Sequence, residues 1–170
     1  MPAVFSSECV VRDHVSGHDF SRAESRSLFQ TDGMASLMID VLRSYTRAGK
    51  LRVHDFVVMR NHLHVLVTVP GDTSVEKAMQ LSKGNFSFRA KKELGFTGEV
   101  WQRAFSDVRI TNEASFRAHQ EYIYNNPVRA GMVSEPADYR YSSAYFRKLK
   151  QAGAKAQIVS AADGTTEVVP

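Results

Sequence analysis

The chain has 170 residues, a formal net charge of +4 and an ordinary composition for a globular protein, with 43% hydrophobic and 24% charged residues. A single cysteine excludes an internal disulfide framework and a cysteine-based zinc site, and it fits a reducing compartment. No apolar run is long enough to span a bilayer and no secretion-signal pattern is present, so we expect one cytoplasmic domain whose mild positive charge suits a polyanionic partner.

The N-terminal segment, residues 1–26, is poorly defined by its pattern. Residues 9–11 can form a short strand, but the sequence that follows is rich in charge and serine. His14 and His18 are four positions apart, a spacing that can bind a metal on a helix. Gly17 argues against a helix there, so we interpret both side chains as solvated loop histidines.

Apolar residues recurring every three or four positions predict helices, and β-branched runs predict strands. In chain order the pattern predicts a helix over 34–48, a strand over 51–59, a tight turn at 60–61, a strand to 69, a helix over 74–94, a strand over 101–110 and a helix from 111 to 126. Gly84 near the middle of the second helix costs about 1 kcal/mol relative to alanine, so we expect a close approach or a bend there. Pro127 should end the last helix, because it disfavours the helical conformation of the residue before it.

The longest apolar, β-branched run, residues 57–69, contains two histidines separated by one leucine. Successive side chains of a strand point to opposite faces, so His62 and His64 should share a face, roughly 6.6 Å apart along the strand. Leu63, Val65 and Val67 should take the other face and be buried under helices. Two imidazoles held side by side can begin a divalent metal site, although the pair alone is more often structural.

The third predicted helix carries Tyr122 and Asn126, which share a face because they are four positions apart. A tyrosine hydroxyl, with an ordinary pKa of about 10, is a poor nucleophile at neutral pH. It can attack a phosphodiester if a metal polarises the phosphate. A metal on His62 and His64, with the Asn126 amide oxygen as a third ligand, could supply that help.

These segments together resemble a known family. Residues 59–67 resemble the His-hydrophobe-His signature of HUH single-strand nucleases and transposases, and residues 122–131 resemble the tyrosine segment of REP-associated tyrosine transposases, which are relatives of single-strand insertion-sequence transposases. Further similarity lies at 76–80, 83–87, 100–102 and 139–143. The resemblance covers about residues 27–145.

The resemblance implies an α+β fold over residues 27–150: a ferredoxin-like antiparallel sheet with helices on one face, as in transposase-like HUH domains. It implies cutting and rejoining of single-stranded DNA at hairpin-forming repeats through a 5′-phosphotyrosine, with Mg2+ or Mn2+ as cofactor and a monomer or homodimer as the working form. Tyr122 would be the nucleophile, with His62, His64 and Asn126 as metal ligands. Residues 151–170, rich in alanine, glycine and threonine, are predicted to be a disordered tail.

Basic residues offer DNA contacts on charge and position only, with a solvated helix face as the plainer interpretation. The candidates are Lys83, Arg89, Lys91, Lys92, Arg103 and Arg129.

Two other functions stay open. One is a catalytically inactive nucleic-acid-binding module of the same fold, and the other is a phosphoesterase that uses water in place of tyrosine. The family's first strand should precede residues 25–30, yet residues 14–21 are poor strand material. The first strand is therefore either short or altered, and its absence would expose a sheet edge.

Overall fold

The computed structural model describes residues 9–98, except 15–27, together with 100–101 and 106–162. The elements are β1 (Cys9–His14), α1 (Asp32–Arg47), β2 (Arg52–Val58), β3 (Leu63–Thr68), α2 (Val75–Leu94), β4 (Ser106–Ile110), α3 (Glu113–Arg129), a 3-10 turn η1 (Pro136–Asp138) and α4 (Ser143–Ala162). The four strands form one sheet in the order β2-β3-β1-β4, and every neighbouring pair is antiparallel. A β-α-β-β-α-β chain in this order is the ferredoxin-like arrangement, so the predicted fold class is confirmed.

The first strand is present and lies in the middle of the sheet. β1 pairs with β3 from Cys9 opposite Thr68 to His14 opposite Leu63, and its other edge pairs with β4. Of the two alternatives for the first strand, the short strand is therefore the one observed. It ends where residues 14–21, the poor strand material, begin. This strand lies within residues 1–26, the N-terminal segment for which a short first strand was one alternative. His18 lies outside the described residues.

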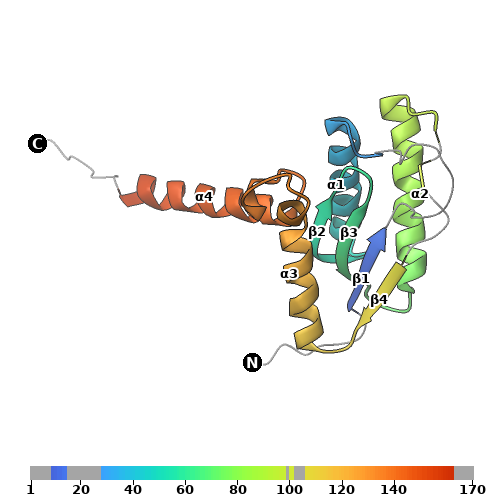
Figure 1. Ribbon diagram of the computed structural model, residues 1–170, viewed down its shortest axis with the longest axis horizontal. Helices are drawn as coiled ribbons and strands as arrows, with labels where there is room; N and C mark the ends of the chain where they lie inside the picture. The colour runs from blue at the N-terminus through green and yellow to red at the C-terminus, as the bar shows by residue number, and fades with distance from the viewer. Residues whose placement is uncertain (1–8, 15–27, 99, 102–105, 163–170) are drawn as a thin grey trace, which may run out of the picture.

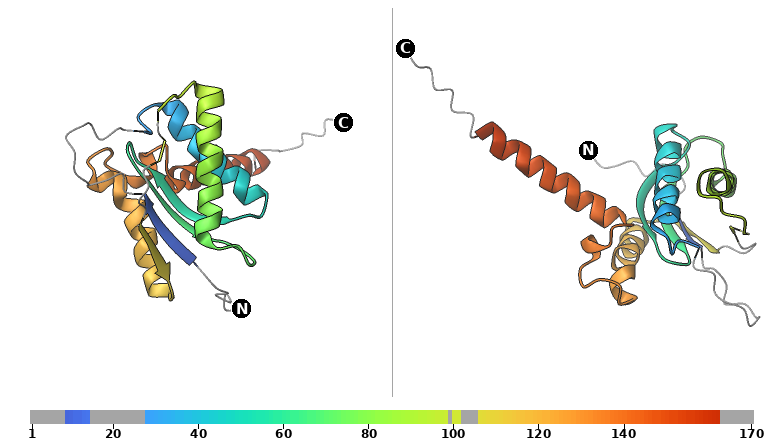
Figure 2. Two further views of the ribbon diagram at one scale, coloured as in Figure 1. Left: turned by 90° about the vertical axis from the view of Figure 1, so that its right-hand side faces the viewer. Right: turned by 90° about the horizontal axis from the view of Figure 1, so that it is seen from above.

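Helices cover both faces of the sheet, whereas the resemblance implied helices on one face. Leu63, Val65 and Val67 of β3 pack into a core with α1 and α2, as their alternation predicts. Leu66 points to the opposite face, where it shares a second core with Ile123 of α3. Figures 1 and 2 show α1 and α2 on one side of the sheet and α3 on the other. The tyrosine helix therefore packs against the face that carries His64.

Local signals fix where the helices begin. Thr31, Ser74 and Asn112 cap α1, α2 and α3, each accepting a hydrogen bond from the backbone N–H three residues later. Gly84 sits inside α2, and among the described residues none lies within 4 Å of a Cβ built on it. The expected close approach at Gly84 is therefore wrong.

Helix α3 continues past the proline that was predicted to end it. Pro127 lacks the N–H that would bond the carbonyl four residues earlier, which costs one hydrogen bond. The following turn still closes, since the Ala130 N–H donates to the Asn126 carbonyl at 3.0 Å. Pro127 is also buried, and α3 ends before Gly131, whose φ is +66°. The prediction that the helix ends near Asn126 is wrong because burial and the remaining hydrogen bonds outweigh the lost one.

The segment after α3 covers the edge of β2. The Val58 N–H donates to the Tyr141 carbonyl at 2.9 Å, and the Tyr139 hydroxyl donates to the Val58 carbonyl at 2.8 Å. Burial raises the pKa of Tyr139, so this hydroxyl stays a donor. A bridge between Val57 and Ser142 extends the pairing. The edge strand is thereby protected from pairing with another chain.

Helix α4 then projects away from the body of the molecule (Figures 1 and 2). It continues through residues 151–162, part of the tail for which composition predicted disorder. Alanine has the highest helix propensity, and repeated alanines in this stretch explain the difference. In the described part of the chain, no helix is long and apolar enough to cross a membrane.

Candidate active site

The two histidines lie side by side at the start of β3. His62 closes the turn between β2 and β3, where the Met59 N–H donates to the His62 carbonyl at 2.8 Å. The His62 and His64 ring centroids are 4.6 Å apart, with the ring planes at 83°. His64 is 3% exposed, so its ring is held by packing on the sheet face that α3 covers. The predicted pair is therefore a rigid feature of the structure.

The Asn61 side chain determines which ring nitrogen of a neutral His62 carries the hydrogen. His62 Nδ1 lies 2.7 Å from the Asn61 Oδ1. An amide oxygen can only accept, so Nδ1 of a neutral His62 carries the hydrogen and Nε2 carries the lone pair. Asn61 was not singled out from the sequence; its place directly before the first histidine, in the turn, is the signal that points to it.

Tyr122 meets the histidine pair from α3. Its ring contacts the His64 ring edge to face, with centroids 5.3 Å apart and planes at 86°. Ile123, 1% exposed, anchors α3 in the second core and so sets the height of the neighbouring Tyr122 above the sheet. Tyr122 itself is 39% exposed, so one side of the phenol remains accessible. The structure brings together the strand and the helix that the sequence predicted to form one site.

Two further predicted site residues, Asn126 and Arg129, follow Tyr122 on α3. Asn126 is half-buried and lies one turn beyond Tyr122 on the same face of the helix. The Arg129 guanidinium lies over the Tyr122 ring, 5.5 Å from its centroid, within the range of a cation–π contact. Arg129 is thus the candidate DNA contact that touches the tyrosine.

Four other basic candidates lie on α2, across the sheet from Tyr122. Arg89 is bound to two carboxylates, with Nη1 at 2.6 Å from Asp40 Oδ2 and Nε at 2.7 Å from Glu93 Oε1. These hydrogen bonds, that of Glu93 first, raise the pKa of Arg89. Lys91 and Lys92 are exposed. Lys83 Nζ lies over the Trp101 ring at 5.2 Å. Arg103 lies outside the described residues.

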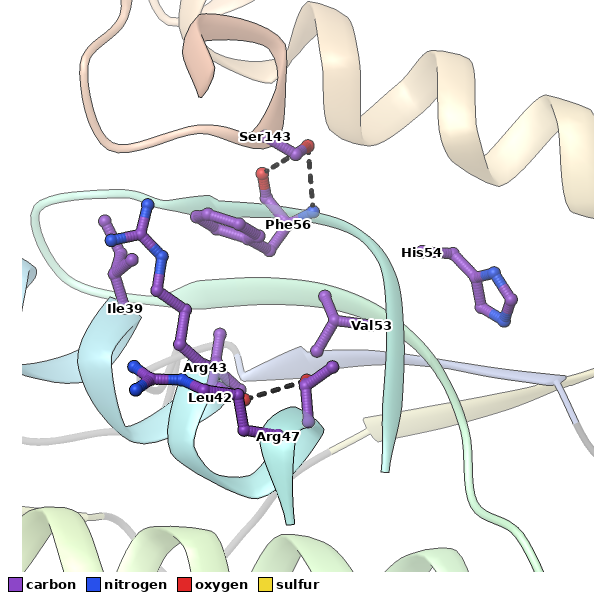
Figure 3. Close-up of a pocket in the computed structure, with 9 residues that line it drawn as sticks. Ile39, Leu42, Arg43, Arg47, Val53, His54, Phe56 and Ser143 are labelled. Atoms are coloured by element: carbon purple, nitrogen blue, oxygen red, sulfur yellow. Dashed lines mark hydrogen bonds between the residues drawn. The ribbon is translucent and has the colours of Figure 1, made fainter. Parts of the chain in front are cut away.

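Hollows on the described part of the surface include the following two. A shallow one of about 510 Å³ runs along α3 beside the tyrosine and is lined by Ala118, Glu121, Tyr122, Asn125, Val128 and Arg129. The other, about 260 Å³, lies between the end of α1, β2 and the start of α4, where Figure 3 shows Arg43, His54 and Ser143 among its walls. None of His62, His64 and Tyr122 lines this second cavity. Of these two hollows, the one along α3 reaches the candidate site, because Tyr122 lines it.

The fold and the site together define a single-sheet α+β domain in which a helix tyrosine faces a pair of strand histidines. The model of the family described as "Transposase IS200 like" matches residues 20–126, more than half of the chain, and this range includes Tyr122, Asn126 and both histidines. The chain belongs to this family.

Curated relatives agree with that assignment, and a solved structure shares the fold. The chain is 29% identical over 98 residues to the REP-associated tyrosine transposase of Escherichia coli, covering 57% of this chain and 56% of that protein. It is 27% identical over 96 residues to a relative from Haemophilus influenzae named as the same kind of transposase, covering 51% and 54%. A REP-associated tyrosine transposase solved bound to a REP hairpin matches with a TM-score of 0.64 at 23% identity, covering 85% of this chain and 80% of that one. The chain spans about half the length of the curated relatives it matches.

Proposed function

We propose that this chain is a metal-dependent tyrosine transposase or endonuclease that cuts and rejoins single-stranded DNA at hairpin-forming repeats. The observation that carries the proposal is the edge-to-face contact of Tyr122 with His64, whose ring in turn lies 4.6 Å from that of His62. The proposed nucleophile on α3 and the two rings proposed to bind the metal are therefore neighbours, although they come from segments far apart in the chain. The names of the relatives and the REP hairpin on the solved neighbour support DNA as the substrate.

In the proposed cleavage step, the Tyr122 hydroxyl loses its proton to solvent and its oxygen forms a bond to a backbone phosphorus. The bond from that phosphorus to the 3′ oxygen breaks, and the 3′ oxygen takes up a proton and leaves as a hydroxyl. The 5′ side stays on the enzyme as a phosphotyrosine. Rejoining reverses the step when a DNA 3′-hydroxyl attacks the phosphotyrosine and releases Tyr122.

The donor set fits a divalent cation such as Mg2+ or Mn2+. Asn61 sets the tautomer of His62 so that Nε2 carries the lone pair, which is a common arrangement for a metal-binding histidine. His62, His64 and Asn126 would hold the ion, and the amide oxygen of Asn126 is a kind of donor that suits Mg2+ or Mn2+. The described residues contain no cluster of three or more histidine, cysteine or acidic side chains, and the third ligand proposed here is an amide. When bound, the ion would polarise the scissile phosphate and offset charge on the leaving oxygen.

The positive side chains would bind the DNA backbone. Arg129, whose guanidinium lies over the Tyr122 ring, would meet the phosphate that Tyr122 attacks, since a guanidinium can bind a phosphate through two hydrogen bonds. Lys83, Arg89, Lys91, Lys92 and Arg103 remain proposals for contacts further along the DNA. The working form would be a monomer or homodimer, acting in the cytoplasm, where chromosomal DNA is accessible.

The test is formation of a covalent protein–DNA adduct with hairpin oligonucleotides taken from DNA flanking the gene, in Mg2+ or Mn2+ and in EDTA. Tyr122→Phe should abolish the adduct because it removes the attacking oxygen. Tyr124→Phe is a matched control, since Tyr124 lies on the same helix with a similar exposure of 38% and should keep full activity.

An undiminished adduct in Tyr122→Phe would overturn the assignment of the nucleophile. Hairpin binding without cleavage in any metal would favour the inactive binding module. Cleavage to ordinary phosphate ends, with no adduct, would favour a phosphoesterase that uses water.

A further inference from the structure

Asp55 of β2 is a buried carboxylate that the proposed chemistry does not use. It is 1% exposed, and burying a carboxylate costs several kcal/mol unless charged or polar donors surround it. A small domain tolerates such a group when its hydrogen bonds are satisfied, so its partners are informative.

The donors to Asp55 come from both helices that pack beside β2. Arg147 of α4 forms a fork, with Nη1 at 3.2 Å from Oδ2 and Nη2 at 3.1 Å from Oδ1. Gln120 of α3 donates from Nε2 to Oδ2 at 3.2 Å. The Ser143 hydroxyl, at the start of α4, donates to Oδ1. The Phe56 N–H donates back to Ser143 Oγ at 3.2 Å, a contact drawn in Figure 3. One carboxylate therefore joins β2, α3 and α4.

An irregularity in β2 directs Asp55 toward those helices. Val53 pairs with Val67 of β3, and Asp55 pairs with Leu66, so His54 is an extra residue in the ladder. Without this bulge, Asp55 would share the face of Val53, which packs against the α1 and α2 core. With it, Asp55 shares the face of Leu66, the face that α3 covers. Bulges commonly redirect a side chain in this way.

Gln120 and Tyr122 occupy opposite flanks of α3. Residues two apart on a helix are about 200° apart around its axis. Gln120 meets Asp55 on the β2 side, Ile123 faces the sheet between them, and Tyr122 meets His64 on the far side. A roll of α3 about its axis would therefore move the phenol relative to the imidazole, and the Gln120–Asp55 hydrogen bond opposes that roll.

We propose that Asp55 is a positioning residue, which holds α3 through Gln120, and α4 through Arg147 and Ser143, so that Tyr122 stays opposite His64. The expected effect on the rate of adduct formation rests on the proposed function, whereas the expected effect on the position of Tyr122 relative to His64 does not. A displacement of about 1 Å at a reacting atom can cost roughly 100-fold in rate.

The test compares Asp55→Asn and Gln120→Leu with the control Asp72→Asn, which removes an exposed carboxylate in the turn between β3 and α2. The first measurement is the NMR position of the His64 ring protons, which the Tyr122 ring shifts by its ring current; Tyr122→Leu supplies the unshifted reference. The second is the single-turnover rate of adduct formation beside the Kd for hairpin DNA.

Asp55→Asn and Gln120→Leu should move the His64 signals toward the Tyr122→Leu reference. Both variants should also slow adduct formation about 10- to 100-fold. Their Kd for hairpin DNA should stay within twofold of that of the parent protein. Asp72→Asn should change none of these. Gln120→Leu keeps the Arg147 and Ser143 bonds to Asp55, so it remains informative if Asp55→Asn does not fold.

Unmoved His64 signals and an unchanged rate in folded Gln120→Leu would overturn the proposal. If the parent protein forms no adduct while both variants move the His64 signals, the positioning role stands and the proposed function fails.

Discussion

At the scale of single residues, the histidine pair depends on a side chain outside the motif. Asn61 accepts from His62 Nδ1 at 2.7 Å, and this bond selects the tautomer that presents Nε2 to a metal. Partners of metal-binding histidines typically contribute 10- to 100-fold in metal affinity or activity. Asn61 is therefore part of the proposed metal site without being a ligand.

We expect Asn61→Ala to raise the Mn2+ concentration needed for half-maximal adduct formation by roughly 10-fold, because the His62 ring loses its orienting acceptor. The measurement is a Mn2+ titration of adduct yield, with saturating metal restoring most of the activity. Asn61→Asp keeps an acceptor oxygen and should stay close to the parent. Equal metal requirements in Asn61→Ala and the parent would show that the bond has no such role.

At the scale of elements, α2 contains a glycine, Gly84, at a position where the described neighbours leave room for a side chain. Gly84 is exposed and has ordinary helical geometry, and the described part of the chain leaves open space around it. Gly95, at the end of the same helix, has a φ of +64°, a conformation that residues with a Cβ adopt only with strain. The two glycines of α2 should thus respond oppositely to the same substitution.

Gly84→Ala should raise the free energy of unfolding by about 0.5–1 kcal/mol, because alanine loses less backbone entropy in a helix. Gly95→Ala should lower it by about 1 kcal/mol because of the left-handed backbone. Urea unfolding of both variants checks the pair. A loss of stability in Gly84→Ala would mean that this position does have a close neighbour.

At the scale of the whole molecule, the sheet has a hydrophobic core on each side, and the two cores hold different helices. The larger joins the sheet to α1 and α2, and the smaller holds α3, which carries the tyrosine. Ile123 is the fully buried contact of α3 in this smaller core. Docking of α3 therefore links the stability of the molecule to the assembly of its site.

Ile123→Ala should cost about 2–5 kcal/mol in the free energy of unfolding, as expected for a large side chain removed from a core, and should also lower the adduct rate of the folded fraction. Ile123→Val, which removes one methylene, should cost about 0.5–1.5 kcal/mol and leave the rate nearly unchanged. Chemical denaturation and single-turnover adduct assays measure the two effects. A cost below 1 kcal/mol for the alanine variant would contradict the role given to this core.

The sequence by itself predicted most of the elements and the residues of the proposed site. Alternation in β3 predicted which residues enter the α1–α2 core and that His62 and His64 share a face, since strand geometry is local. Helical spacing likewise predicted that Tyr122 and Asn126 lie on one face. Local rules failed at Pro127, which is buried within a continuing helix. They left the first strand open, and the short β1 is held by pairing on both sides.

Only the tertiary structure decided how the parts meet. No pattern within α3 states that its ring will lie 5.3 Å from His64, because that distance depends on packing between segments far apart in the chain. Nor does the sequence around Asp55 reveal a bulge that turns its carboxylate toward Gln120 and Arg147. Chemical identity and spacing are local properties of the chain, whereas the alignment of a tyrosine with a histidine pair is fixed by the burial and hydrogen bonds that join α3 to the sheet.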